Sequence, residues 1–347
     1  MTAGTLRNVR LATIGVCLAA LSVSVFAQRV QITGAGATFP FPIYSKWFSE
    51  YNKLNPNVEI NYQSLGSGAG IRQLQNGTVF FGATDGPMTN DQLAAAPGRV
   101  LHLPTVLGAV VPIYNVPGVS AELKFTGPLL ADIFLGKITR WNDAAIAKVN
   151  AGVTLPNTEI TTVHRSDGSG TTYIWVDYLA KVSAEWKQKV GVNTAVNWPN
   201  GLGGARSDGV TALVKQTPGA IGYVELIYAE QNKIAYGSVQ NSSGQFVKAS
   251  LESTTAAAAE AAAKMPADFR VSITNAPGQT AYPIASFTWL LLQENPSDKA
   301  KSKTMVEFVK WAIGPVGQKF AADLGYAPLP AQVVKLELEA LSKVKVQ

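Results

Sequence analysis

Short loops rich in glycine and serine recur three times in this chain, and each stands where a helix is expected to begin. The first joins a short predicted strand, Val30–Thr33, to a helix with an aromatic stripe from Tyr44 to Tyr51. The second follows the alternating strand Val58–Gln63, and the third precedes the apolar segment Ile174–Leu179. Apolar residues at i, i+4 and i+5 in that segment indicate a helix. Strands that alternate with helices predict an α/β fold with a largely parallel sheet covered on both faces.

These loops suit the binding of anions. The first N–H groups of a helix have no partner within the helix, and the macrodipole is positive at that end. Glycine lets a ligand approach the backbone closely, so such a helix start is a ready anion site. Arg165, just before the third loop at 168–171, adds a planar fork of donors suited to an oxyanion. That stretch alone fits an ordinary capped helix equally well, but the repetition of the pattern favours an anion site.

The N-terminal segment has the pattern of a secretory signal peptide. Two arginines precede an apolar run, Leu11–Phe26, and a small-residue cleavage site ends at Ala27. The run is short for a membrane span. We therefore expect residues 1–27 to be removed and the exported protein to begin near Gln28. The single cysteine, Cys17, lies within the removed segment, so the exported chain would hold no disulfide.

The length of the chain indicates two domains, and its charge argues against nucleic-acid binding. The chain has 347 residues, and the 320 that would remain after cleavage suggest two domains. The formal net charge is +6, of which the two arginines of the signal segment carry two. A mild positive charge without a basic block helps to attract small anions, but it is poor support for nucleic-acid binding. We expect no nucleic-acid partner.

Two apolar stretches are expected to cross between the domains. The run Val106–Tyr114 is nearly continuous, as in a strand buried on both faces, and Pro283–Leu292 is a second candidate. Two crossings imply that the first domain is built from both ends of the chain. We therefore predict a first lobe of residues 28–107 and 284–347 and a second lobe of residues 108–283.

An alanine-rich segment, 256–264, has high helix propensity and is expected to form an exposed helix. Ser253 or Thr254 would serve as its N-cap. We interpret this helix as structural rather than functional.

The loops combine many hydrogen-bond donors with few acceptors. A carboxylate beside a divalent anion is repulsive unless the anion carries a proton, as protonated phosphate does and sulfate at neutral pH does not. Asp85 stands at the C-terminal end of a predicted strand, where α/β sheets place ligand contacts, and would disfavour sulfate. It could instead be a turn residue or a helix cap. Asp167 could face the ligand or pair with Arg165.

The sequence contains little that favours catalysis. It has two histidines, His102 and His164, and it lacks an H-E-x-x-H motif, cysteine ligands outside the signal segment, and a P-loop lysine. His164 could act as a base for Ser169, although closeness in sequence does not place a catalytic triad. His102 is expected to be structural. We expect no metal, no cofactor and no enzymatic activity.

Six segments, in order along the chain, resemble the periplasmic phosphate-binding proteins of bacterial ABC-type phosphate importers. They cover nearly all of the chain after the signal segment: 33–40, 66–70, 81–87, 135–141, 165–171 and 218–225. The resemblance implies a two-lobed periplasmic binding protein fold, in which each lobe is a central, mostly parallel sheet flanked by helices. It also implies a monomer in the periplasm that closes over one phosphate and delivers it to a permease of two transmembrane subunits with a cytoplasmic ATPase.

The resemblance also implies the ligand set, position by position. Asp85 would accept the phosphate's proton, Asp167 would brace Arg165, and Phe39 would donate through its backbone N–H. The full set of phosphate-binding residues is Thr38, Phe39, Ser67, Asp85, Arg165, Asp167, Ser169, Gly170 and Thr171. Phe80 departs from the family, where many relatives have Asp, and so does His164. The alternative is a secreted phosphatase or related hydrolase that retains phosphate as product, which would need a metal or an activated nucleophile.

Overall fold

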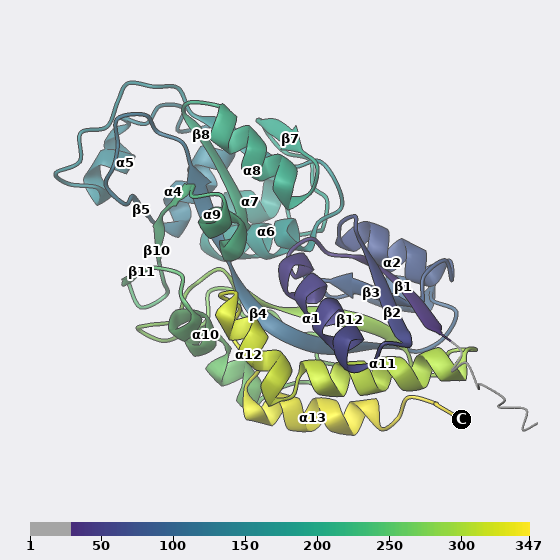
Figure 1. Ribbon diagram of the computed structural model, residues 1–347. Coiled ribbons are helices and arrows are strands. Elements are labelled where there is room, and N and C mark those ends of the chain that lie inside the picture. Colours follow the sequence, from purple (N-terminus) through teal and green to yellow (C-terminus); the bar gives the residue numbers. More distant parts are fainter. Residues whose placement is uncertain (1–28) are drawn as a thin grey trace, which may run out of the picture.

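The computed structural model describes residues 29–347, so the expected signal segment with Cys17 lies outside the described residues. A nine-stranded sheet runs through both lobes in the order β2-β1-β3-β12-β4-β8-β6-β7, with β9 paired to β4 (Figure 1). The two-lobed α/β fold predicted from the sequence is confirmed. Of the helices in the described part of the chain, none has the length and hydropathy that a membrane crossing requires.

The first lobe is built on three parallel strands, and helices cover both faces. The strands are β1 (Val30–Gly36), β2 (Val58–Ser64) and β3 (Phe81–Thr84). One face packs on a large core that includes the aromatic stripe of α1, and the other packs on a small core with α2. The helices of this lobe are α1 (Phe41–Leu54), α2 (Ser67–Gln75), α3 (Asn90–Ala94), α11 (Lys299–Ala312), α12 (Pro315–Asp323) and α13 (Ala331–Leu341).

One long strand connects the lobes. All 15 residues of β4 (Val100–Tyr114) are buried; the strand pairs with β12 (Ala285–Gln293) up to Ala109 and with β8 (Ala220–Glu225) from Val110 onward. Figure 1 shows β4 running from one lobe into the other. The two apolar stretches predicted to cross coincide with β4 and β12, and β12 pairs with β3 and with the part of β4 up to Ala109. Both run antiparallel to their neighbours, whereas the strands farther out in each lobe are parallel.

The second lobe repeats the design with shorter strands. β6 (Thr161–Arg165) lies between β8 and β7 (Leu202–Gly204), parallel to both. The helices of this lobe are α4 (Gly127–Phe134), α5 (Ala144–Val149), α6 (Gly170–Val182), α7 (Ala184–Lys189), α8 (Arg206–Gln216) and α9 (Leu226–Gln231). The short strands are β5 (Lys124–Phe125), β9 (Ala235–Tyr236), β10 (Ser238–Gln240) and β11 (Phe246–Val247).

The alanine-rich helix differs from its prediction in two respects. α10 (Leu251–Ala263) begins earlier than expected, with Ser250 as its N-cap in a capping box with Ser253. One face, which includes Ala257 and Ala258, is buried, and the helix packs against β4 and β12. The prediction of an exposed helix was therefore wrong for this face, because small side chains also allow a helix to approach a sheet closely.

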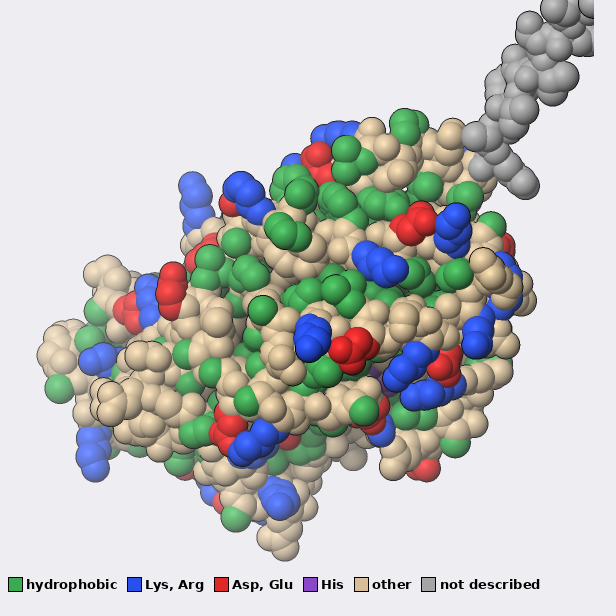
Figure 2. Space-filling model, turned by 90° about the horizontal axis from the view of Figure 1, so that it is seen from below, with side chains coloured by type: hydrophobic (Ala, Val, Ile, Leu, Met, Phe, Trp, Pro, Cys, Tyr) green, Lys and Arg blue, Asp and Glu red, His purple; other side chains and the backbone are tan. Residues whose placement is uncertain are grey.

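Both signs of charge occur in small, mixed groups on the face of the molecule shown in Figure 2. Figure 2 shows lysine or arginine side chains beside acidic ones across one face of the molecule, without a block of either sign. Several lysines of the described residues form helical i,i+4 pairs with acidic residues, such as Lys319–Asp323, and such pairs contribute little to stability when exposed.

Candidate functional site

The third loop is shaped by a helix cap. β6 ends at Arg165, and α6 begins at Gly170 with Ser169 as its N-cap. The Ser169 hydroxyl accepts a hydrogen bond of 3.1 Å from the Thr172 N–H and is fully buried. This cap fixes the start of α6 directly after the third loop.

Arg165 is held by a carboxylate two residues away. Its Nε lies 2.8 Å from Asp167 Oδ1, and Nη2 contacts Oδ2, so the predicted brace is present. Burial opposes ionisation of Asp167, but the hydrogen bonds and charge of Arg165 hold the pKa of Asp167 below its ordinary value. Asp167 also accepts from the Arg206 N–H, which ties the start of α8 to the loop. The remaining guanidinium nitrogen, Nη1, donates to Thr38 Oγ1 of the first lobe at 3.2 Å.

The second loop begins a helix earlier than the sequence suggested. α2 starts at Ser67 rather than near Ile71, so the glycines that follow Ser67 lie in its first turn. Gly66 has φ 97°, and a Cβ there would stand 2.3 Å from Asp167 Oδ2. Glycine is required at this position both for the backbone conformation and for the close approach of the third loop.

The second and third loops contact each other directly. The Gly68 N–H donates to the Gly168 carbonyl at 2.9 Å, and the Gly170 N–H donates to Ser67 Oγ at 3.0 Å. These bonds join a helix start of one lobe to a helix start of the other. The lobes are therefore closed against each other at these loops.

Asp85 is a buried carboxylate with one satisfied oxygen. It directly follows β3, and its Oδ1 accepts from Thr288 Oγ1 of β12 at 2.8 Å. Oδ2 has no hydrogen-bond partner among residues 29–347, and a Cβ placed on Gly170 would lie 2.6 Å from it. Burial raises the pKa of Asp85 to about 7, against the opposing effects of the Thr288 hydrogen bond and the Arg165 charge. Asp85 is not the cap of α3, because Thr89 fills that role.

The first loop, which contains Thr38 and Phe39, lies where the lobes meet. Thr38 Oγ1 is 2.7 Å from Ser207 Oγ of α8, and both residues are buried. The Phe39 ring packs on β4 at Gly108, where a Cβ would stand 2.5 Å from the ring. The structure thus brings the predicted residues of all three loops together. Sequence reasoning missed Ser207 and Thr288, since no motif links them to these loops.

The two histidines have structural partners. His164 stacks on Trp198, with ring centroids 4.7 Å apart, and its Nδ1 lies 3.1 Å from the Arg165 carbonyl oxygen. The geometry gives no support to His164 as a base for Ser169. His102 accepts from the Met88 N–H at 3.1 Å, in agreement with its predicted structural role. No group of metal-binding side chains occurs in the described residues.

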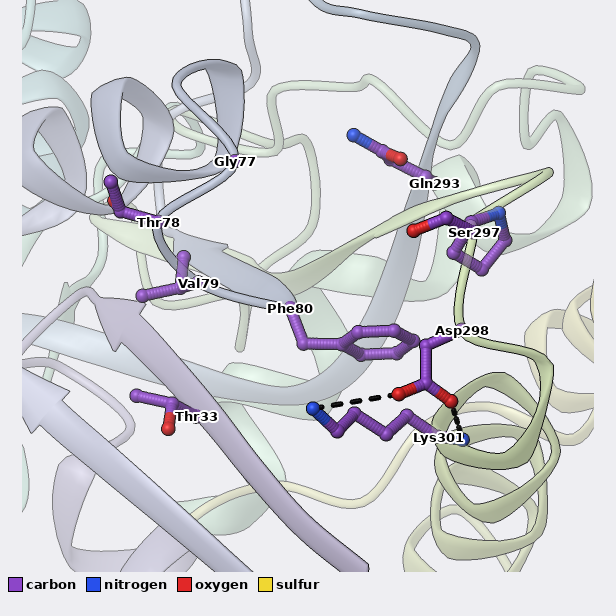
Figure 3. A pocket seen from close by; sticks show the side chains of 10 residues that line it. Thr33, Gly77, Thr78, Val79, Phe80, Gln293, Ser297, Asp298 and Lys301 are labelled. Atoms are coloured by element: carbon purple, nitrogen blue, oxygen red, sulfur yellow. Dashed lines mark hydrogen bonds and ion pairs between the residues drawn. The ribbon is translucent and has the colours of Figure 1, made fainter.

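Phe80 lies away from these loops. It lines a cavity of about 410 Å³ together with Thr33, Asp298 and Lys301. Figure 3 shows the Phe80 ring beside the Asp298 and Lys301 side chains. Phe80 precedes β3 and Asp85 follows it, so the two residues are roughly 16 Å apart along the strand. The departure from the family at this position therefore lies outside the three loops.

Comparison with known proteins places the chain among binding proteins. The profile of the PBP superfamily domain matches residues 24–316. The chain is 49% identical over 314 residues to the phosphate-binding protein PstS of Xylella fastidiosa strain 9a5c, with 90% of this chain and 85% of that protein covered. It is 46% identical over 333 residues to PstS of Pasteurella multocida strain Pm70, covering 94% and 96%. The solved phosphate-binding protein from Stenotrophomonas maltophilia shares the fold, with a TM-score of 0.67 at 18% identity over 89% and 93% of the chains.

Proposed function

Because the chain belongs to the PstS family of phosphate-binding proteins within the PBP superfamily, we propose that it binds inorganic phosphate for an ABC-type phosphate importer. In this proposal, residues 1–27 are removed and the protein works in the periplasm as a monomer. It passes phosphate to a permease of two transmembrane subunits with a cytoplasmic ATPase. The proposed ligands are the residues that converge at the three loops: Thr38, Phe39, Ser67, Asp85, Arg165, Ser169, Gly170 and Thr171, with Asp167 as the brace of Arg165.

The observation that carries this proposal is the unpaired oxygen of Asp85. Its Oδ2 is a buried acceptor in a site whose other groups are mainly donors. The hydroxyl of Thr171 is also buried without a partner among residues 29–347. Buried polar groups are normally hydrogen-bonded. A protonated oxyanion would satisfy both at once, by donating its proton to Asp85 and accepting from Thr171.

The change of partner along β4 supports closure of two lobes over the ligand. We propose lobe boundaries at residues 28–107, 108–283 and 284–347, with hinges near 107 and 284. β4 exchanges β12 for β8 between Ala109 and Val110, close to the first proposed hinge. Bending there would separate or join the loop contacts described above, as in hinge closure around a ligand.

The phosphatase alternative has no support. The named relatives are phosphate-binding proteins. Ser169 is engaged as the cap of α6, and His164 stacks on Trp198.

Calorimetric titration tests the proposal. At pH 8, above the pKa of about 7 of Asp85, the wild-type protein should bind phosphate and discriminate against sulfate. In Asp85→Asn, the charge is lost but an amide oxygen can still accept. The difference in binding free energy between phosphate and sulfate should shrink by about 1–3 kcal/mol, the cost of an unpaired buried group.

Asp91→Asn is the matched control for this titration, because it removes the same charge from an exposed position on α3. It should leave this difference unchanged. Absence of phosphate binding by the wild type would refute the proposed function. An unchanged difference in Asp85→Asn would show that the aspartate does not set the selectivity.

A further inference from the structure

Three tyrosine hydroxyls bind three successive carbonyl groups of the first loop. Tyr62 of β2 donates to the Ala37 oxygen at 2.8 Å, and Tyr326, which precedes α13, donates to the Phe39 oxygen at 2.6 Å. Between them, Tyr228 of α9 donates to the Thr38 oxygen at 2.5 Å. Tyr62 and Tyr326 belong to the first lobe, as does the loop. Tyr228 reaches the loop from the second lobe.

The bond from Tyr228 falls on the peptide that carries the Phe39 N–H. A peptide unit is planar and trans, so its C=O and N–H point in opposite directions. Holding the Thr38 oxygen from one side therefore fixes the direction of the Phe39 N–H on the other. Hydrogen bonds in a chain also polarise one another in a low-dielectric interior, which makes that N–H a stronger donor.

Tyr228 is well placed for this role. Glu225 caps α9 by accepting from the Ile227 N–H at 2.8 Å, so Tyr228 stands in the first turn of a fixed helix. Its side chain is buried, and burial raises the pKa of its phenol, so the hydroxyl stays protonated and donates throughout the physiological range. The Thr38 oxygen also accepts from the Phe41 N–H at 3.2 Å, which anchors the same peptide to the start of α1.

We propose that Tyr228 is a positioning residue for the ligand: from the second lobe, it orients and polarises the Phe39 N–H of the first lobe. This inference rests on the proposed function, because the Phe39 N–H is a proposed phosphate donor. A donor of one lobe then reaches full strength only where α9 of the other lobe meets it.

The neighbouring tyrosine provides a matched control. Tyr326 makes the same kind of bond, one peptide farther along the same loop, and it is also buried. The peptide it holds links Phe39 to Pro40, and proline has no N–H. Loss of the Tyr326 hydroxyl leaves the same kind of carbonyl with one bond fewer, but it removes no support from an N–H donor.

The test compares Tyr228→Phe and Tyr326→Phe by phosphate calorimetry and thermal unfolding. Both variants should unfold at lower temperature than the wild type. Tyr228→Phe should bind phosphate about tenfold more weakly, as expected for a weakened hydrogen bond to a charged group. Tyr326→Phe should stay within about twofold of the wild type. Equal losses of affinity in the two variants, or none in Tyr228→Phe, would overturn the inference. Failure of the wild type to bind phosphate would refute the proposed function instead.

Two further measurements keep the test decisive. With ¹⁵N-labelled phenylalanine, the Phe39 amide proton of the phosphate complex should move upfield in Tyr228→Phe and stay in place in Tyr326→Phe. If Tyr228→Phe does not fold, site-specific Tyr228→3-fluorotyrosine retains the hydroxyl and makes it a stronger donor. Phosphate affinity should then rise, and an affinity that is unchanged or lower would contradict the proposal.

Discussion

The first and third loops present similar donors but are held by different means. In the third loop, Ser169 caps the Thr172 N–H, and Asp167 braces Arg165, so the partners are two or three residues apart. In the first loop, Thr38 is held by residues from distant parts of the chain. Its hydroxyl contacts Ser207, and its carbonyl accepts from Tyr228. The side chains of Arg165 and Ser169 are thus fixed mainly by neighbours in the sequence, whereas the Thr38 side chain is fixed by residues far away in the sequence.

This difference predicts which variants affect the ligand directly and which affect closure of the lobes. In the third loop, Arg165 and Ser169 are fixed by partners within the second lobe. In the first loop, Thr38 is also bonded to Ser207 and Tyr228 of the opposite lobe. Variants of the third loop should therefore act locally and directly on the ligand. Variants that disturb the contact between lobes should act on closure as well.

The largest effect is expected for Arg165→Ala, which removes a proposed ligand donor and the link from the third loop to Thr38. It also leaves Asp167 without its main partner in a partly buried position. Truncating one partner of a buried charged pair in a complex costs about 2–5 kcal/mol of binding free energy, and we expect a loss of that order for phosphate in calorimetry. Arg165→Lys keeps the charge but loses the bidentate fork, so its affinity should be intermediate. Wild-type affinity in Arg165→Ala would mean that the site lies elsewhere.

A smaller effect, on closure, is expected for Gly170→Ala. A Cβ at this position would stand 2.6 Å from the Asp85 N and from Ser67 Oγ, so the lobes could not meet as they do here. Overpacking of this kind typically costs about 1–3 kcal/mol. In small-angle scattering, phosphate should reduce the radius of gyration of the wild type but not that of the variant.

Gly98→Ala is the control for this closure experiment, because nothing lies within 4 Å of a Cβ there. It should contract with phosphate as the wild type does. Equal contraction of Gly170→Ala and the wild type would argue against closure through these loops.

The smallest effect is expected for Ser169→Ala, which removes the local cap of α6. Loss of a serine cap costs about 0.5–2 kcal/mol of stability, measurable by denaturant unfolding. Phosphate affinity should fall as well, because the same hydroxyl is a proposed ligand donor. Ser250→Ala removes the cap of α10 and should lower stability alone. If both variants kept full phosphate affinity, Ser169 would be a structural cap only.

The sequence alone was sufficient to predict those parts of the molecule whose partners are close along the chain. The alternation of strand, loop and helix is local, and so are the helix start after the third loop and the pairing of Arg165 with Asp167. The buried strands β4 and β12 were also predictable, since a nearly continuous apolar run indicates burial on both faces. Helix starts were less certain: α2 begins at Ser67 because Gly66 adopts a positive φ that lets the helix begin there.

Only the tertiary structure decided which distant residues hydrogen-bond to the site residues and which side chains are buried. Ser207 lies 169 residues from Thr38, Tyr228 lies 190 residues from it, and Thr288 lies 203 residues from Asp85. Spacing along the chain carries no signal for pairs so far apart, because the folding of both lobes onto β4 brings them together. The raised pKa of Asp85 has the same origin, since burial is produced by packing around the side chain and not by its neighbours in sequence. The proposed ligand residues could thus be predicted from the loop patterns and the family resemblance. The burial of Asp85 and the hydrogen bonds that hold the Thr38 peptide exist only in the folded protein.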